Sequence, residues 1–99
     1  MTYSVNVRPQ AAEDIAEAYA WYESQQSGLG SKFLDAVETA IVRIADGPKR
    51  YAAVLHNVRR TLIRRFPYSI YFRAQDEEVR VIAVLHQHRD PRMLRRRIS

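Results

Sequence analysis

The chain has 99 residues, of which 46% are hydrophobic, so it suits one compact domain and leaves no room for a second core. It contains no cysteine, which excludes disulfides and thiolate metal sites, and no stretch approaches the roughly 18 apolar residues of a membrane span. We therefore expect a single domain over residues 1–99, located in the cytoplasm and without membrane association.

The net charge of +5 is distributed unevenly between the two halves. Residues 1–50 contain 5 Lys/Arg and 7 Asp/Glu, whereas residues 51–99 contain 11 and 4, so the halves carry −2 and +7. A concentrated basic charge attracts anionic partners, which favours nucleic acid or an acidic protein segment as the partner of the second half. The alternative interpretation is a solvated basic face.

The first half predicts a strand followed by a helical hairpin. Residues 3–7 alternate apolar and polar side chains, and Pro9 ends that strand and suits the first turn of a helix. Two apolar stripes of helical period follow, made of Ala11, Ile15, Ala18, Tyr19 and Tyr22, and then of Phe33, Leu34, Val37, Ile41 and Ile44. A polar, glycine-containing connection over residues 25–30 separates the helices, and Gly47 with Pro48 ends the second.

The second half predicts three strands, at residues 54–65, 68–74 and 79–86, each rich in β-branched or aromatic side chains. The acidic segment 75–78 is of hairpin length, so the last two strands are expected to be antiparallel. The last strand has Val79, Val81, Ala83 and Leu85 on one face and Ile82 and Val84 on the other, which indicates a central strand covered on both sides.

The predicted fold is α+β, with an N-terminal strand, a helical hairpin and a three-stranded antiparallel sheet, in the order β-α-α-β-β-β. A basic tail follows at residues 90–99. Its apolar side chains, Met93, Leu94 and Ile98, leave two interpretations open: a short helix that packs on the sheet or docks a partner, or disorder in the unbound chain.

Several stretches together resemble the ParE/RelE toxin family across nearly the whole chain. They are residues 11–15 with Trp21-Tyr22, the Gly28-Leu29-Gly30 turn before Phe33, Arg59-Arg60 through the block Phe66-Pro67-Tyr68-Ser69-Ile70-Tyr71, and the sequence Val84-Leu85-His86-Gln87-His88-Arg89-Asp90-Pro91. Each motif is weak alone, and it is their order that is specific.

The resemblance implies a toxin that is encoded beside an antitoxin and neutralised in a toxin–antitoxin hetero-oligomer. Antitoxins of this kind carry an acidic and hydrophobic segment that folds on the toxin, which fits the basic second half. We expect the tail to make those contacts through Arg92, Leu94, Arg95, Arg96 and Arg97.

The resemblance also implies one of two targets. ParE-like members inhibit DNA gyrase, and RelE-like members cleave messenger RNA on the ribosome. The blocks at residues 66–71 and 85–91 are more similar to the ParE-like side, so we expect gyrase inhibition without a hydrolytic centre.

The nuclease alternative requires an acid or base and cations for the phosphate. The candidate catalytic residues are His86, His88 and Arg89. RelE-like nucleases usually carry an arginine near the start of the penultimate strand, where this chain has Phe66-Pro67-Tyr68 and places Arg73 only later.

The candidate target-binding residues under either hypothesis are Arg60, Arg64, Arg65, Tyr71, Arg73, His86, His88 and Arg89. Strand alternation sends neighbouring arginines to opposite faces, so at most half of the cations at residues 59–65 can line one site. No cofactor or metal is expected, because no third ligand accompanies His86 and His88. A third hypothesis, a non-toxic basic nucleic-acid-binding module, fits poorly because the first helix exposes mainly glutamates.

Overall fold

The computed structural model describes residues 2–98 and has the expected α+β architecture. Its elements are β1 (Ser4–Val7), α1 (Pro9–Gln25), α2 (Leu29–Asp46), the short 3-10 helix η1 (Pro48–Arg50), β2 (Ala53–Leu55), β3 (Val58–Leu62), β4 (Tyr68–Gln75), β5 (Glu78–His86) and α3 (Pro91–Ile98). Within residues 2–98, no helix is at once long and apolar enough to span a bilayer.

The sheet has five strands, in the order β1-β5-β4-β3-β2, where three were predicted after the helical hairpin. One of the two further strands in the sheet is β1, the predicted N-terminal strand, which lies parallel to β5. The other arises because the predicted strand at residues 54–65 is broken into β2 and β3 by a turn, in which His56 adopts a left-handed backbone with φ of 52°. The remaining neighbouring pairs are antiparallel.

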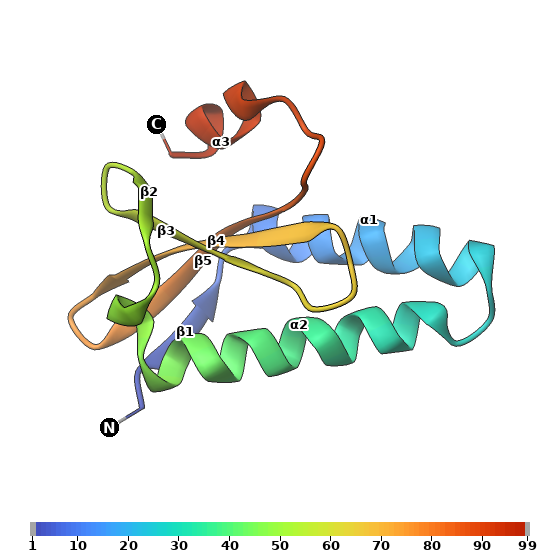
Figure 1. Cartoon of the computed structure of the whole chain (residues 1–99), viewed down its shortest axis with the longest axis horizontal. Coiled ribbons are helices and arrows are strands. Elements are labelled where there is room, and N and C mark those ends of the chain that lie inside the picture. The colour runs from blue at the N-terminus through green and yellow to red at the C-terminus, as the bar shows by residue number, and fades with distance from the viewer. Residues whose placement is uncertain (1, 99) are drawn as a thin grey trace.

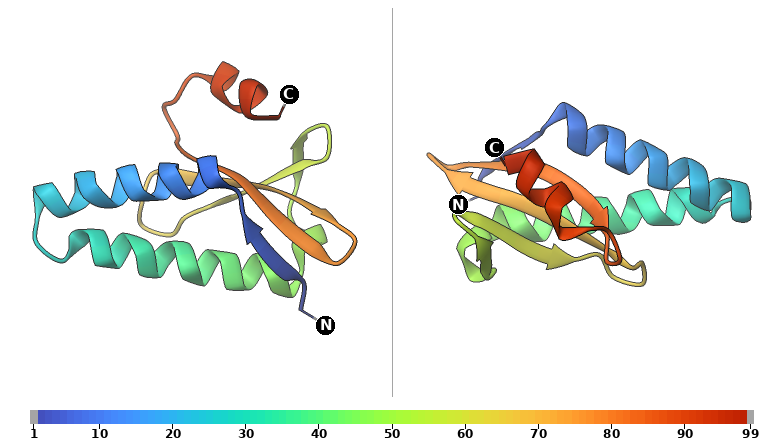
Figure 2. Two further views of the ribbon diagram at one scale, coloured as in Figure 1. Left: turned by 180° about the vertical axis from the view of Figure 1, so that it is seen from behind. Right: turned by 90° about the horizontal axis from the view of Figure 1, so that it is seen from above.

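The helices lie on both sides of the sheet. Figure 1 shows α2 below the strands and α3 above them, and Figure 2 shows from behind how α1 and α2 form an antiparallel hairpin. The main core lies under the hairpin, where the rings of Tyr22, Phe33, Phe66 and Tyr68 pack against one another with centroids 4.9–6.1 Å apart. Their packing fixes the hairpin on the sheet.

A second, smaller core lies under α3. The buried side chains are Val58, Ile82, Ala83 and Leu85, and Tyr71, Met93, Leu94 and Ile98 pack against them. Of the two interpretations of the tail, the structure therefore shows the helix that packs on the sheet. The hydrophobic residues of α3 face inward, and most of its arginines are left at the surface.

A β-bulge changes which face each side chain of β5 occupies. Across β4, Tyr71 pairs with Ala83 and Phe72 pairs with Val81, so Ile82 is an extra residue in β5. Ala83 consequently lies under α3 rather than beside Val81 under the hairpin. The predicted common face of residues 79, 81, 83 and 85 was wrong beyond the bulge, whereas the central position of β5, between β1 and β4, is confirmed.

The turn between α1 and α2 is closed by a side chain that the periodicity had assigned to the exposed face of α1. The carboxylate of Glu23 accepts hydrogen bonds from the backbone N–H groups of Gly28 and Gly30, both at 2.9 Å, at the start of α2. Gly28 has φ of 89°, and a Cβ on Gly30 would lie 2.8 Å from atoms of Tyr19. Both glycines are thus required by the geometry of the turn.

The predicted β4–β5 hairpin is present, and its two-residue turn suggests a stabilising substitution. Asp76 and Glu77 have φ of 54° and 62°, the left-handed pair of a type I′ turn. Because glycine adopts this backbone without strain, Glu77→Gly should raise the free energy of unfolding by about 0.5–1 kcal/mol. Urea denaturation followed by circular dichroism measures the change, and a loss of stability would contradict the assigned turn.

Candidate target-binding face

The face of the sheet that carries α3 brings together four of the predicted target-binding residues. Arg60 of β3 and Tyr71 of β4 are register partners, and His86 and Arg89 follow at and beyond the end of β5. They border a groove of about 330 Å³, which we call the α3 groove. Its lining comprises Val54, Leu55, Arg60, Tyr71, Leu85, His86, Gln87, Arg89, Asp90, Pro91, Leu94 and Arg95.

The two histidines meet through a turn rather than along a strand. β5 ends at His86, and the backbone N–H of His88 donates to Nδ1 of His86 at 3.1 Å. The two rings lie 5.3 Å apart, and His86 also contacts the ring of Tyr68 edge to face at 5.2 Å. Because Nδ1 of His86 accepts a hydrogen bond, only its Nε2 is available to an external partner.

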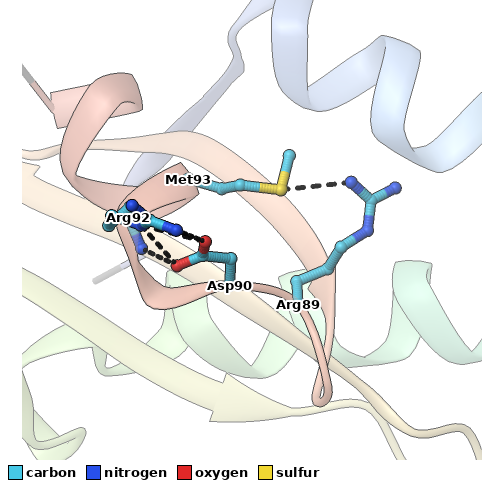
Figure 3. Close-up of polar contacts among 4 residues, drawn as sticks. All are labelled: Arg89, Asp90, Arg92 and Met93. Carbon is cyan, nitrogen blue, oxygen red and sulfur yellow. Dashed lines mark hydrogen bonds and ion pairs between the residues drawn. The ribbon is translucent and has the colours of Figure 1, made fainter.

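Arg89 and Asp90 position the start of α3 (Figure 3). Asp90 accepts hydrogen bonds from the backbone N–H of Arg92 at 2.9 Å and from its guanidinium at 2.8 Å, which caps the helix. The Arg92 guanidinium lowers the pKa of the Asp90 carboxyl. Arg89 reaches instead toward the sulfur of Met93, with Nη1 3.1 Å from Sδ.

Arg89 also borders a second hollow, of about 220 Å³, on the side of α1. Asp14, Glu17 and Trp21 contribute its α1 wall, and Trp21 is 57% exposed. Tyr68 and His86 line the opposite wall. Burial raises the pKa of the Tyr68 phenol, so this hydroxyl is a protonated hydrogen-bond donor at neutral pH.

A buried ion pair holds α3 in place over this face. Nη1 of Arg97 lies 2.8 Å from Oδ2 of Asp14, and Nη2 lies 3.1 Å from Oδ1. The same guanidinium donates to the carbonyl of Ile82 at 3.0 Å, and Asp14 accepts from the N–H of Val84 at 2.9 Å. Hydrogen bonding to Asp14 raises the pKa of Arg97.

Both charged side chains of the pair are largely buried, with 14% of Arg97 and 15% of Asp14 exposed. Arg97, one of the predicted antitoxin contacts, is therefore used within the fold. Asp14 was predicted only as a negative charge near the start of the first helix, and its pairing with Arg97 was not predicted. Only its position one turn before the buried Ala18 placed it near the sheet.

Of the other predicted target-binding residues, His88 lies beside His86 and the three arginines lie elsewhere. Arg64 and Arg65 line a separate groove beside α2. Arg73 pairs with Arg80 across the sheet. It lies five residues along β4 from Tyr68, the register partner of His86, so Arg73 and Tyr68 are about 17 Å apart along the strand. Alternation also separates Arg59, which donates to the carbonyl of Tyr51, from Arg60, as predicted. For Arg64 and Arg65 the predicted alternation was wrong, because β3 ends at Leu62 and both side chains line the same groove from the turn that follows.

The α3 groove thus combines the guanidinium groups of three arginines with a phenol and an imidazole. The arginines are Arg60, Arg89 and Arg95, and Asp90 is the one acid in the lining. Such a set binds carboxylates or phosphates through charge-assisted hydrogen bonds. Over residues 2–98, His, Asp and Glu side chains nowhere gather in threes as a metal-ligand set.

Comparison with known proteins places most of the chain in a defined group. Residues 5–91 match the model of a family described as the ParE toxin of the type II toxin–antitoxin system parDE. Toxin ParE2 from two strains of Mycobacterium tuberculosis is 29% identical over 103 aligned residues, which cover 100% of this chain and 95% of the relative.

Solved structures share the fold at lower identity. The chromosomal ParDE toxin–antitoxin system from P. aeruginosa superposes with a TM-score of 0.77 and 18% identity, covering 86% of this chain and 96% of that chain. The toxin–antitoxin complex RelBE2 from Mycobacterium tuberculosis superposes with a TM-score of 0.61 and 24% identity, covering 87% of this chain and 99% of that chain. A mutant of E. coli RelE in the free state superposes with a TM-score of 0.66 and 17% identity, covering 89% of this chain and 86% of that chain.

Proposed function

This chain belongs to the ParE toxin family of type II toxin–antitoxin systems, and we propose that it arrests growth by binding and inhibiting DNA gyrase. The observation that carries the proposal is the match to the ParE family over residues 5–91, because gyrase inhibition is the activity that the ParE-like resemblance implies. The α3 groove is the proposed contact surface, with Arg60, Arg89 and Arg95 as its arginines.

The arrangement of the groove supports binding rather than hydrolysis. Arg64, Arg65 and Arg73 all lie outside the α3 groove, so they do not join Arg60, Arg89 and Arg95 in a clamp around one scissile phosphate. Nδ1 of His86 is engaged by the backbone of His88, and the raised pKa of Tyr68 disfavours a phenolate base. The arginines of the α3 groove are suited to recognising carboxylates of a protein surface.

The second proposed partner is a cognate antitoxin, with which the chain would form a hetero-oligomer in the cytoplasm. The tail residues predicted to meet it are positioned differently by α3: Arg92, Arg95 and Arg96 are exposed, whereas Leu94 is half-buried and Arg97 pairs with Asp14. We propose that the exposed arginines attract the acidic partner. Contacts of Arg97 with the antitoxin would require α3 to move.

Induced expression of the chain in bacteria, alone and with its neighbouring gene, tests the proposal. We expect growth arrest, altered plasmid supercoiling and intact messenger RNA from the toxin alone, and normal growth from the pair. Codon-phased cleavage of messages would favour the RelE-like alternative. Absence of arrest would favour a binding module without toxicity.

One observation keeps the nuclease alternative as a second candidate: His86, His88 and Arg89 lie within one turn at the end of β5. Under the gyrase proposal, wild-type protein and the His86→Ala/His88→Ala variant should both leave ribosome-bound message uncut, as judged by primer extension. A nuclease would instead cut message, and the double substitution would slow it about 100-fold or more. Antitoxin affinity, measured in parallel, controls for folding of the variant.

A further inference from the structure

The hollow of about 220 Å³ on the side of α1, which we call the α1 hollow, adjoins the proposed target-binding surface. Leu85, His86 and Arg89 line both this hollow and the α3 groove, so the two meet at the end of β5. Sites for small molecules usually have volumes of about 300–1,000 Å³. The smaller α1 hollow is suited to a single side chain of a protein partner.

Trp21 belongs to the α1 wall of the hollow and is held in place by an aromatic cluster. It is the only tryptophan of the chain, and it is 57% exposed. Its ring contacts the ring of Tyr22 edge to face, with centroids 5.1 Å apart, and Tyr22 is buried against Phe33, Phe66 and Tyr68. A large ring that is already fixed loses little conformational freedom on binding, and tryptophan is enriched among the residues that dominate interface energies.

Polar groups without a partner in the fold line the same hollow. Within residues 2–98, neither the carboxylate of Glu17 nor the hydroxyl of Tyr68 makes a hydrogen bond or an ion pair. Burial raises the pKa of Tyr68, whereas Arg89 acts to lower it and Glu17 to raise it, so both charges lie within electrostatic reach of the phenol. The hollow thus offers one acceptor, Glu17, and two donors beside the exposed indole ring.

The charges around the α1 hollow balance one another. Asp14 is paired with Arg97, which leaves Glu17 and Arg89 as one negative and one positive charge in the lining. An ammonium group or a phosphate would find no net opposite charge there. α1 also contains no Lys or Arg, so its acidic residues would repel a nucleic acid strand; they are Glu13, Asp14, Glu17 and Glu23. This charge pattern favours an uncharged side chain of a protein.

We propose that the α1 hollow receives one aromatic side chain of the gyrase surface, and that tyrosine fits it best. The ring would pack on Trp21 and on the apolar lining residues Ala18 and Val84. The hydroxyl would donate to Glu17 and accept from Tyr68, which satisfies both groups. The inference rests on the proposed function, and it makes Trp21 a second anchor of the target beside the arginines of the α3 groove.

Substitutions of Trp21 test the aromatic contact. Trp21→Leu should weaken binding to purified gyrase at least about 30-fold, measured by calorimetry. Trp21→Phe keeps an aromatic ring and should bind at least about fivefold more tightly than Trp21→Leu. The control is Val42→Ala, which removes a 63% exposed side chain outside the α1 hollow and should change the affinity less than about threefold. Equal affinities of the leucine and phenylalanine variants would overturn the aromatic pairing.

Two substitutions of Glu17 test the uncharged hydroxyl. Glu17→Gln retains a hydrogen-bond acceptor, whereas Glu17→Leu removes it, so the glutamine variant should bind gyrase at least about fivefold more tightly. If the target instead placed a cation in the hollow, both variants would lose the attracting charge and would be weakened alike. Equal weakening would therefore overturn the proposal. Thermal unfolding verifies that each variant is folded.

The single tryptophan allows its burial in the complex to be observed directly. Trp21 replaced biosynthetically by 5-hydroxytryptophan can be excited at longer wavelength than the tryptophans of gyrase. Acrylamide quenching of its fluorescence should fall at least about threefold when gyrase is added, because anchor residues of an interface are excluded from water. Unchanged quenching in the complex would show that the target does not cover the α1 hollow.

The outcomes also separate this inference from the proposed function. If wild-type protein binds gyrase and Trp21→Leu binds it equally well, the role of the α1 hollow is wrong and the proposed function stands. If wild-type protein binds no gyrase, the proposed target itself is wrong. If Trp21→Leu bound gyrase normally but the substitution abolished cleavage of messenger RNA, the hollow would hold a nucleobase, which would overturn the inference.

Discussion

Replacing Arg97 by methionine is expected to lower the free energy of unfolding by about 3 kcal/mol. Methionine keeps the aliphatic stem but removes the guanidinium, which leaves the carboxylate of Asp14 buried, at 15% exposure, and still accepting a hydrogen bond from the N–H of Val84. The substitution also removes the hydrogen bond to the carbonyl of Ile82, where α3 meets the bulge of β5. Urea denaturation followed by circular dichroism measures the loss.

Two further variants make this prediction decisive. Arg92→Met removes an exposed partner of Asp90 and should change stability much less, because surface ion pairs contribute little. Adding Asp14→Leu to Arg97→Met should restore part of the lost stability, since no buried charge is then left without a partner. If Arg97→Met and Arg92→Met were equally stable, the Asp14–Arg97 pair would not hold α3 on the sheet.

Reversing two charges of the α3 groove is expected to abolish toxicity. Arg60→Glu with Arg89→Glu replaces two of the three arginines of the groove by carboxylates, and like charges repel where opposite charges had attracted an anionic target. The concentration of protein that inhibits gyrase by half should rise about 100-fold or more, which corresponds to about 2.7 kcal/mol of binding free energy. A supercoiling assay with purified gyrase measures it.

The control for this prediction is Arg8→Glu with Lys49→Glu. This pair changes the net charge by the same amount as Arg60→Glu with Arg89→Glu, at exposed positions outside the α3 groove. It should inhibit gyrase as well as the wild type. Thermal unfolding verifies that both variants are folded. Full inhibition by Arg60→Glu/Arg89→Glu would show that the target binds another surface.

Local signals accounted for most of the fold. Pro9 begins α1 as predicted, and α2 ends before Gly47, because capping and backbone constraints act within a few residues. The division of the predicted strand at residues 54–65 was missed, since His56 adopts its left-handed backbone without a glycine or Asn-Gly signal. The bulge at Ile82 was missed because it depends on pairing with β4.

The candidate site was less predictable, because it depends on register and on contacts distant in sequence. Arg60 and Tyr71 belong together only through the β3–β4 register, whereas Arg73, two residues further along β4, pairs with Arg80 and lies outside the α3 groove. Asp14 and Arg97 are 83 residues apart, and each resembles an exposed charge when its helix is considered alone. Periodicity identifies the face of a helix but not the element that covers it.

The most direct test of gyrase inhibition is whether the purified protein stops DNA gyrase from supercoiling relaxed plasmid. We predict dose-dependent inhibition that is relieved by the antitoxin encoded beside the chain. Normal supercoiling at concentrations of toxin that arrest growth would contradict gyrase as the target.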